Sequence, residues 1–348
     1  MSEFATRLIA WQKRHGRHDL PWQNTQDPYA IWVSEIMLQQ TQVSAVIDYY
    51  SKFMARFPNI AALAQASQDE VLQHWSGLGY YSRARNLHKA AQKIVVDFDG
   101  KFPQDFVAIQ TLPGIGRSTA AAIAAFAFHQ TQTILDGNVK RVLARHFLVE
   151  GWPSAPAVEK KLWLLAEALL PQQDMIAYTQ GLMDLGATVC TRSKPKCYLC
   201  PFLNTCAAYH HERVAELPTP KPRKALPIKK TAMLVLQHDG LILLEKRPEK
   251  GIWGGLLSLP EIEVDADILQ MIQENFKTNI ASHRPLAAFT HVFTHFKLDI
   301  HPHMIEITLL PKNLAGIYHW LTLESAMQAA IPTPIRHILQ ILNDQTGH

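Results

Sequence analysis

The chain has 348 residues, of which 47% are hydrophobic and 18% are charged, and its formal net charge is +4. This length predicts two domains, and the composition is that of a soluble globular protein. The mildly basic balance permits a polyanionic partner without requiring one. No basic segment followed by an apolar run opens the sequence, so we expect no signal peptide. The most apolar run, 120–128, is far shorter than a membrane span, and we expect a cytoplasmic protein that binds no membrane.

Helical periodicity dominates residues 1–210. Asp27 followed by Pro28 is typical of a helix start, and apolar residues recur at helical spacing from there to Phe57. Further helices are expected at 60–75, 83–98, 104–111, 118–128, 139–149, 156–170 and 175–189.

The segment 211–230 has four prolines and an excess of Lys and Arg, so it cannot continue a helix and is interpreted as a linker. The pattern then changes to that of an α+β domain at 231–348. Residues 233–236 and 241–244 flank a turn and predict a β-hairpin. Further strands are expected at 286–293, 296–303 and 304–310, and helices at 265–276 and 334–343.

All four cysteines lie in the segment 190–206, as Cys190, Cys197, Cys200 and Cys206. Four thiolates from one loop suit a [4Fe–4S] cluster or a structural zinc ion. A disulfide framework is disfavoured, because the chain is long and shows no secretory signal. Zinc sites usually use two tight cysteine pairs, and only Cys197 and Cys200 form one here, so the spacing favours iron–sulfur.

A Pro-Gly-x-Gly turn at 112–118 joins two predicted helices. Such a hairpin leaves backbone N–H groups bare at the start of the next helix, through Gly114 and Gly116, and that geometry binds a phosphate without reading sequence. The alternative is an ordinary tight turn.

Two acidic residues have unusual positions. Asp136 stands at the start of the predicted helix 139–149, where it either caps the helix or, ionised by the helix N-terminus, stabilises a nearby cation. Glu35 lies on an apolar helix stripe, where burial would raise its pKa and suit it to act as a general acid. The alternative for Glu35 is an acid at the solvated rim of that stripe.

Two further segments have the composition of a nucleic-acid surface. The uncharged amides within 38–42 could bind base edges or fill a base stack, and 77–86 mixes glycine, tyrosine and arginine. Ordinary solvated helix surfaces are the alternative in both cases.

Together these features resemble the helix–hairpin–helix DNA glycosylases with an iron–sulfur loop, over residues 1–208. The shared marks are 112–118, Asp136 and the cysteine loop. Segments 34–43, 77–81 and 135–142 resemble the MutY type, the A/G-specific adenine DNA glycosylases. The endonuclease III branch has a lysine directly after Gly-x-Gly-Arg, where this chain has Ser118. A serine cannot form a Schiff base, which implies base removal without efficient strand nicking.

Residues 231–345 resemble the Nudix-like C-terminal domain of the same type, through Arg247-Pro248, 251–256 and Leu259-Pro260. The metal-binding R-E-x-x-E-E run of Nudix hydrolases is absent from the sequence, so we expect no pyrophosphatase activity. Segment 289–295 matches the family's F-x-H-x-F-S-H, with a threonine in place of serine. The resemblance implies that 8-oxoguanine is contacted by Phe293, Thr294 and His295.

The resemblance therefore implies a mainly α helix–hairpin–helix glycosylase domain at 1–210 with its iron–sulfur loop, and an α+β Nudix-like recognition domain at 231–348. The implied activity is that of a monomeric, monofunctional base excision repair enzyme on double-stranded DNA. It would hydrolyse the N-glycosidic bond of adenine opposite 8-oxoguanine or guanine and leave an abasic site. Glu35 would protonate the base, Asp136 would stabilise the sugar cation, Asn138 would orient groups around the sugar, and the four cysteines would hold a [4Fe–4S] cluster.

Candidate residues for binding DNA follow from the same comparison. The duplex would be filled or wedged by Gln39, Gln40, Leu78 and Tyr80; adenine would be held by Leu20, Trp22 and Gln180; other contacts would come from Thr41, Arg83, Gly114, Gly116, Ser118 and Lys140. The rival interpretations are a glycosylase-lyase acting on oxidised pyrimidines, a DNA-binding lesion sensor without catalysis, and a nucleotide hydrolase of the Nudix kind.

Overall fold

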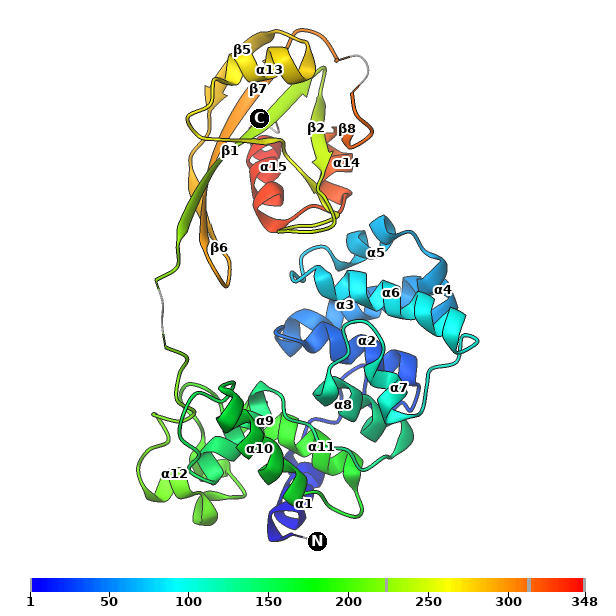
Figure 1. Ribbon diagram of the computed structural model, residues 1–348, viewed down its shortest axis with the longest axis vertical. Helices are drawn as coiled ribbons and strands as arrows, with labels where there is room; N and C mark the ends of the chain where they lie inside the picture. The colour runs from blue at the N-terminus through cyan, green and yellow to red at the C-terminus, as the bar shows by residue number, and fades with distance from the viewer. Residues whose placement is uncertain (1, 223–224, 312–313, 347–348) are drawn as a thin grey trace. The chain divides into compact units, whose positions relative to one another are not determined.

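The computed structural model describes residues 2–222, 225–311 and 314–346 (Figure 1). The chain forms two compact units. Unit 1 contains Met1–Gln65 and Asn86–Arg223, and unit 2 contains Ala66–Arg85 and Lys224–His348. The ranges 1–210 and 231–348 expected from the sequence describe order along the chain, and as domain boundaries they stay a prediction. No helix in the described ranges is long and apolar enough to cross a membrane.

Unit 1 is helical, as its periodicity predicts. Helix α1 packs against α11, α2 against α3 and α8, and α9 against α10, α11 and α12. The helices are α1 (Glu3–His15), α2 (Pro28–Leu38), α3 (Val43–Arg56), α4 (Ile60–Gln65), the greater part of α6 (Ser82–Asp97), α7 (Phe106–Gln110), α8 (Arg117–Phe128), α9 (Gly137–His146), α10 (Pro156–Ala168), α11 (Met175–Asp184) and α12 (Ala207–His210).

Two predicted helices differ from the observed ones. The predicted helix 60–75 is two helices, α4 and α5 (Gln68–Trp75), because the Ser67 hydroxyl accepts the Glu70 N–H at 3.2 Å and starts a new helix. The predicted helix 175–189 is α-helical only to Asp184 and continues as a π-helix, Leu185–Val189, directly before the cysteine loop. Such π-helical turns often occur at functional sites.

The hairpin between α7 and α8 depends on one glycine. Gly114 has a φ of +80°, and a Cβ added there would lie 2.8 Å from Cβ of Asn86 on α6. Gly116, the residue before α8, has open space around its own missing Cβ, and α8 starts without a side-chain cap. The turn is thus tightly packed on one side, while the start of α8 remains open on the other.

Unit 2 contains a mixed sheet, which in the described residues has eight strands. Strand β1 pairs in parallel with β7 and antiparallel with β2, and α13 (Ile268–Phe276) packs Ile272 and Phe276 onto the sheet (Figure 1). The strands are β1 (Ile228–His238), β2 (Leu241–Lys246), β3 (Leu257–Ser258), β4 (Glu261–Ile262), β5 (Ile280–Pro285), β6 (Phe289–Val292), β7 (Lys297–Ile307) and β8 (Tyr318–Thr322); the remaining helices are α14 (Leu323–Gln328) and α15 (Thr333–Thr346).

The predicted hairpin is confirmed as β1 and β2, but two strand predictions are wrong. Residues expected as separate strands at 296–303 and 304–310 form the single strand β7. Pro302 suggests a break there, yet its carbonyl accepts the Leu286 N–H at 2.8 Å and the pairing with β1 continues past it. Strand β5 was not predicted, and β1 begins at Ile228, inside the predicted linker.

Substitution of Gly114 by alanine tests the packing of the hairpin, and Gly100→Ala is its matched control. Both glycines have positive φ, but only Gly114 has a neighbour, Asn86, in the way of a Cβ. We expect Gly100→Ala to lower the free energy of unfolding by about 1 kcal/mol through backbone strain alone. Gly114→Ala should cost about 1–3 kcal/mol more through overpacking. Urea unfolding measures both changes. If the two variants lose the same free energy of unfolding, Asn86 does not constrain the turn.

Candidate active site and cysteine loop

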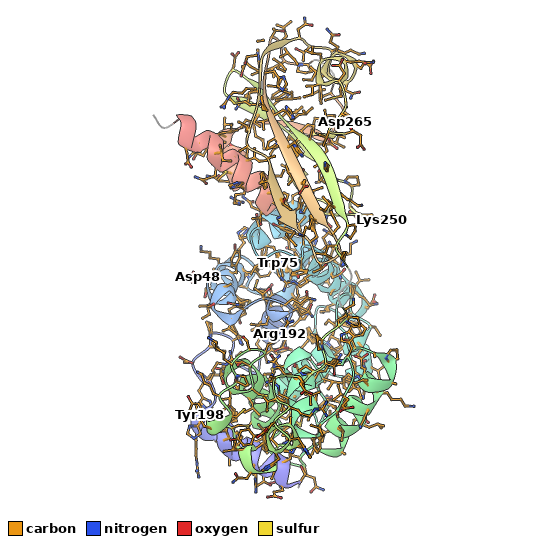
Figure 2. All side chains as sticks on the ribbon, turned by 90° about the vertical axis from the view of Figure 1, so that its left-hand side faces the viewer. Asp48, Trp75, Arg192, Tyr198, Lys250 and Asp265 are labelled. Carbon is orange, nitrogen blue, oxygen red and sulfur yellow. The ribbon has the colours of Figure 1, made fainter. Side chains whose placement is uncertain are left out.

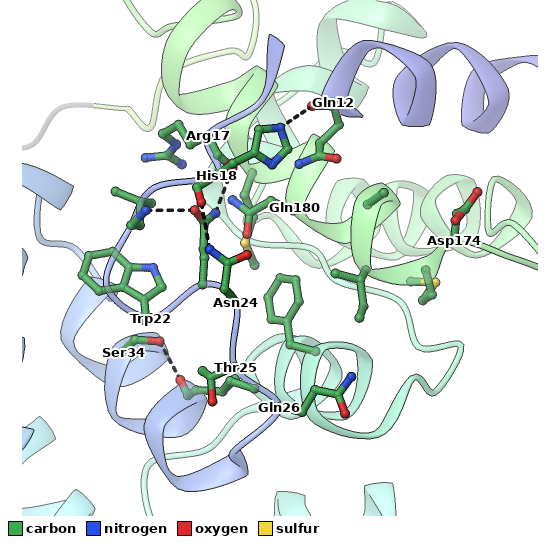
Figure 3. A pocket seen from close by; sticks show the side chains of 18 of the residues that line it. Gln12, Arg17, His18, Trp22, Asn24, Thr25, Gln26, Ser34, Asp174 and Gln180 are labelled. Carbon is green, nitrogen blue, oxygen red and sulfur yellow. Dashed lines mark hydrogen bonds between the residues drawn. The ribbon is translucent and has the colours of Figure 1, made fainter. Parts of the chain in front are cut away.

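A pocket of about 980 Å³ lies within unit 1. Its walls come from the segment after α1, from α2, and from α11 together with the segment before it (Figure 3). Four sequence-predicted residues line it together, namely Leu20, Trp22, Glu35 and Gln180. Figure 3 shows the Trp22 indole and the Gln180 amide among the lining side chains. An aromatic face and an amide are groups that can stack on and hydrogen-bond a planar base.

The pocket segment after α1 is held by a partly buried ion pair, Arg17 with Asp184, which the sequence did not indicate. Asp184, which is fully buried at the end of α11, accepts from Arg17 Nε at 2.7 Å and from the Arg17 N–H at 2.9 Å. The Gln180 amide also donates to Asp184, at 2.8 Å, so this adenine-pocket candidate is already oriented. The sequence did contain a signal for Asp184, because it is an acid on an apolar helix face, as Glu35 is.

Glu35 is the acidic group of the pocket wall. It lies on α2 between buried neighbours, and its side chain is only partly exposed, toward the pocket. Burial raises the pKa of Glu35 to about 8, and the negative charge of Asp136 adds to that rise. Glu35 is therefore protonated at neutral pH, which is the state required of a general acid.

Asp136 is the N-cap of α9, and its Oδ1 accepts the Val139 N–H at 2.8 Å. Burial raises the pKa of Asp136, opposed by the N–H groups of Val139 and Asn138 and by the cations Arg141 and Lys140. The pKa of Asp136 is thus raised, whereas the helix N-terminus alone would lower it. These partners stabilise the anionic form of Asp136, whereas burial and the charge of Asp136 both favour the neutral form of Glu35.

The surroundings of Asp136 are fixed by hydrogen bonds from two sides. The Ser118 hydroxyl accepts the Leu135 N–H at 3.0 Å, next to Asp136. Asn138 Oδ1 accepts from Arg141 Nη2 at 2.7 Å, and Arg141 Nε donates to the Cys190 carbonyl at 2.7 Å. The start of α9 is thereby tied both to the hairpin helix α8 and to the beginning of the cysteine loop.

All four cysteines line one small cavity of about 30 Å³, and none forms a disulfide. Arg145, which is buried on α9, donates to Cys190 Sγ at 3.4 Å and to the Thr191 carbonyl at 2.7 Å. Burial raises the pKa of the Cys200 thiol to about 12. On the outside of the loop, Tyr198 is 76% exposed (Figure 2).

Four cysteine sulfurs face a common space, and four thiols are a donor set that an iron–sulfur cluster or a structural zinc ion can take. In the described residues, no group of three or more His, Cys, Asp or Glu side chains is placed to share a single ion. A zinc ion needs sulfurs about 2.3 Å from itself, whereas an iron–sulfur cluster holds its thiolates farther apart.

Of the predicted DNA-binding residues of unit 1, some already form hydrogen bonds or an ion pair within the protein, and one is exposed. Gln40 is exposed at a positive φ of 57°, in the turn between α2 and α3, whereas Gln39 Nε2 donates to Thr119 Oγ1 at 3.3 Å. Thr41 follows in the same turn and donates to the Gln39 carbonyl at 3.4 Å. Lys140 pairs with Glu159 at 2.6 Å, so a phosphate contact would require that pair to open.

The predicted DNA-binding residues of unit 2 lie at two sites. In the loop before α6, Tyr80 is 46% exposed and Leu78 is 8% exposed, and Arg83, in the first turn of α6, is buried. The Arg83 guanidinium donates to the carbonyls within this loop, and burial lowers its pKa to about 10. The second place is the β6–β7 hairpin, where Thr294 and His295 are exposed and the Phe293 ring stacks on Phe296 with centroids 4.5 Å apart.

Comparison with known proteins agrees with this arrangement. Residues 33–168 match the model of the HhH-GPD superfamily base excision DNA repair proteins, and residues 231–340 match that of the NUDIX domain. A solved thermostable thymine-DNA glycosylase is 31% identical, with a TM-score of 0.54, over 60% of this chain and 95% of its own. The helical unit thus has the fold of a helix–hairpin–helix DNA glycosylase.

Full-length relatives narrow the family further. The adenine DNA glycosylase of Buchnera aphidicola subsp. Baizongia pistaciae is 41% identical over 99% of this chain and 98% of its own length. The adenine DNA glycosylase of Homo sapiens is 33% identical over 99% of this chain and 75% of its own. This chain belongs to the adenine DNA glycosylase family, and it is accordingly a hydrolase of the base excision repair type.

The raised pKa of Glu35 predicts a stability change in Glu35→Gln. Between the unfolded pKa near 4.5 and the folded pKa near 8, the folded protein retains a proton that the unfolded chain has released. Wild-type stability therefore falls as pH rises through this window, whereas the glutamine variant does not titrate here. Its advantage over wild type should grow with pH to a few kcal/mol, from about 1.4 kcal/mol per pKa unit. Urea unfolding between about pH 5 and pH 8.5 measures this, and a pH-independent difference would mean that Glu35 is ionised in the folded protein.

Proposed function

We propose that this protein is a monofunctional DNA glycosylase that removes adenine paired with 8-oxoguanine or guanine and leaves an abasic site. The observation that carries this proposal is a neutral acid, Glu35, in the wall of a pocket large enough to admit a base and within electrostatic range of a second carboxyl, Asp136. Two carboxyl groups in different protonation states are the arrangement that glycosidic bond cleavage requires.

The geometry supports the following reaction. Adenine leaves the base stack, at a cost of roughly a few kcal/mol, and enters the pocket beside Trp22 and Gln180. Glu35 donates its proton to N7 of the base, and the C1′–N9 bond breaks with positive charge developing on the sugar. Asp136 stabilises that cation, whose charge in turn lowers the pKa of the carboxyl. Water adds to C1′, and its proton returns to a carboxylate.

Strand cleavage would require an amine that can attack C1′. At the position after Arg117 the chain has Ser118, whose hydroxyl accepts the Leu135 N–H. Lys13 lines the pocket, but it is an exposed residue paired with Asp174 at 3.0 Å. These features support base removal without lyase action.

Recognition of the base opposite adenine is assigned to the β6–β7 hairpin. Its exposed Thr294 hydroxyl lies within 3.0 Å of the His295 ring, and the hairpin presents both beside the stacked Phe293. A hydroxyl and an imidazole can hydrogen-bond the edge of a modified guanine. The proposed partner is double-stranded DNA that contains the mispair, and the enzyme acts on it as a cytoplasmic, DNA-associated monomer.

The cofactor is a [4Fe–4S] cluster held by Cys190, Cys197, Cys200 and Cys206, as is common among relatives of this type. When bound, it supplies a rigid, positively charged centre that keeps the thiols ionised. The chain's own residues then position the loop, because Arg145 holds the Cys190 sulfur and the Thr191 carbonyl from inside α9.

Single-turnover adenine release from a duplex with one A:8-oxoguanine pair tests the reaction. We expect strand breaks only after alkali treatment, and a rate that falls as pH rises above about 8, where Glu35 loses its proton. Glu35→Gln should bind the duplex and release adenine at least 10²-fold more slowly, the order expected for loss of a general acid. Near-normal release by Glu35→Gln would remove Glu35 from the mechanism, and breaks without alkali would restore the lyase interpretation.

Metal analysis of the purified protein tests the cofactor. We expect about four iron atoms and four sulfides per chain, because four cysteines saturate one [4Fe–4S] cluster. Cys200→Ser should lose that iron, raise susceptibility of the 190–206 loop to proteolysis and weaken DNA binding. About one zinc per chain would contradict the assignment, and unchanged DNA affinity in iron-free Cys200→Ser would exclude a role of the loop in binding.

A further inference from the structure

Unit 2 includes a segment that the sequence places within the helical half. Residues 66–85, which form α5 and the loop before α6, cluster with residues 224–348. Polar contacts hold this segment at several points. They run from Lys246 Nζ to Asp69 Oδ2 at 2.7 Å, from Gln73 Nε2 to the Gln328 carbonyl at 2.9 Å, from Ser76 Oγ to the Ile331 carbonyl at 3.2 Å, and from Arg336 Nη2 to Ser76 Oγ at 3.1 Å.

The loop 77–81 in this segment is rigid and presents one exposed ring. The Trp75 indole N–H donates to the Gly79 carbonyl at 3.2 Å, and Arg83 donates to the same carbonyl at 3.2 Å. The Tyr81 hydroxyl donates to the Ile331 carbonyl at 3.4 Å. Tyr80, held at a φ of +49°, is 46% exposed despite these restraints. An aromatic ring fixed on the surface in this way can stack against a base.

The β6–β7 hairpin rests on a second loop, 251–255. Its Trp253 is 8% exposed, and the indole lies 5.6 Å from the Phe293 ring and 6.1 Å from the His291 ring between centroids. The next residue, Gly254, has no room for a side chain, because a Cβ there would lie 2.2 Å from the Glu249 carbonyl oxygen. The path of this loop therefore sets where the hairpin stands. Figure 2 labels Trp75 on α5 and Lys250 just before the loop.

Arg85 connects these two loops. It lies in the first turn of α6, directly after the loop that carries Tyr80, and its Nη1 donates to the Gly254 carbonyl at 2.5 Å. The guanidinium is partly buried, where a charge-assisted hydrogen bond is stronger than in water. Leu72 of α5 lies beside the adjoining Gly255, since its Cδ1 would be 3.5 Å from a Cβ added there. The segment 66–85 thus lies along the second loop and holds it through the Arg85 hydrogen bond.

We propose that Arg85 is a specificity-determining positioning residue, which holds the Gly254 loop and with it the recognition hairpin at a fixed spacing from Tyr80. This inference rests on the proposed function, since it assumes that the hairpin reads the base opposite adenine. Tyr80 and the hairpin then contact the mispair as one unit, and loss of the Arg85 bond lets them move independently. The discrimination between 8-oxoguanine and guanine falls, while the adenine pocket, which lies in unit 1, keeps its chemistry.

A different role for Arg85, a direct phosphate contact, makes distinct predictions. A phosphate contact would weaken binding to every duplex about equally and reduce the salt dependence of binding by about one charge. A positioning role changes the ratio between two substrates that differ only in the opposite base.

The test is single-turnover adenine release by wild type, Arg85→Met, Arg85→Lys and the control Arg284→Met, on A:8-oxoguanine and A:G duplexes. We expect Arg85→Met to lower the ratio of the two rates on the order of tenfold, as for loss of one charge-assisted hydrogen bond. Arg85→Lys should recover part of the ratio, because an ammonium can still donate to the Gly254 carbonyl. Arg284→Met removes an exposed arginine of the same unit, on β5, and should leave the ratio unchanged.

Equilibrium binding in a Glu35→Gln background gives the same ratio without catalysis, and urea unfolding shows whether Arg85→Met is folded. An unchanged ratio in folded Arg85→Met, with wild type still preferring 8-oxoguanine, overturns the inference alone. An equal loss on both duplexes assigns Arg85 to phosphate binding and also overturns it. If wild type releases no adenine, or shows no preference, it is the proposed function that fails.

Discussion

The site depends on keeping one carboxyl neutral beside another. Burial raises the pKa of both Glu35 and Asp136, and the negative charge of Asp136 raises the pKa of Glu35 further. Two such groups cannot both carry charge at moderate cost in a site of low polarity. Their surroundings decide which one keeps the proton. Asp136 has backbone N–H donors and two nearby cations, whereas Glu35 has burial and a neighbouring negative charge acting on it. The surroundings of each carboxyl thus favour the acid role proposed for Glu35 and the anion role proposed for Asp136.

The start of α9 must therefore be held firmly. Ser118 restrains the residue before Asp136, and Arg141 restrains Asn138 two residues after it. Arg141 and Arg145 extend from the same helix to the Cys190 carbonyl and sulfur. A loop closed around a cluster can support these arginines, because its carbonyls are then fixed in place. In the proposed function, the cysteine loop is thus connected mechanically to the catalytic Asp136 through the arginines of α9, and this connection requires no redox chemistry.

Much of this arrangement could be predicted from the sequence, for identifiable physical reasons. Helical periodicity located the helices of unit 1, and an acid on an apolar stripe singled out Glu35, because the apolar face of a helix is a local pattern of its own sequence. The Arg17–Asp184 pair joins residues far apart in the chain, and no local pattern connects them. The same holds for Arg85 and Gly254, since a backbone carbonyl carries no sequence signal at all. The direction of the Asp136 pKa was also beyond the sequence, because the N-cap position is local but the degree of burial is not.

The division of the chain into two units has a consequence for specificity. An adenine opposite thymine and an adenine opposite 8-oxoguanine are the same leaving group, so a pocket that binds only adenine cannot distinguish them. Specificity is a difference between two affinities, and here that difference must come from the opposite strand. Unit 2 holds both an exposed stacking ring, Tyr80, and a polar hairpin carrying Thr294 and His295, joined through Trp253 and Arg85. Residues 66–85 belong to the same unit as the C-terminal part, so the two groups proposed to contact the opposite base share one support. Glu35 and Asp136, the carboxyl pair of the proposed reaction, belong to unit 1.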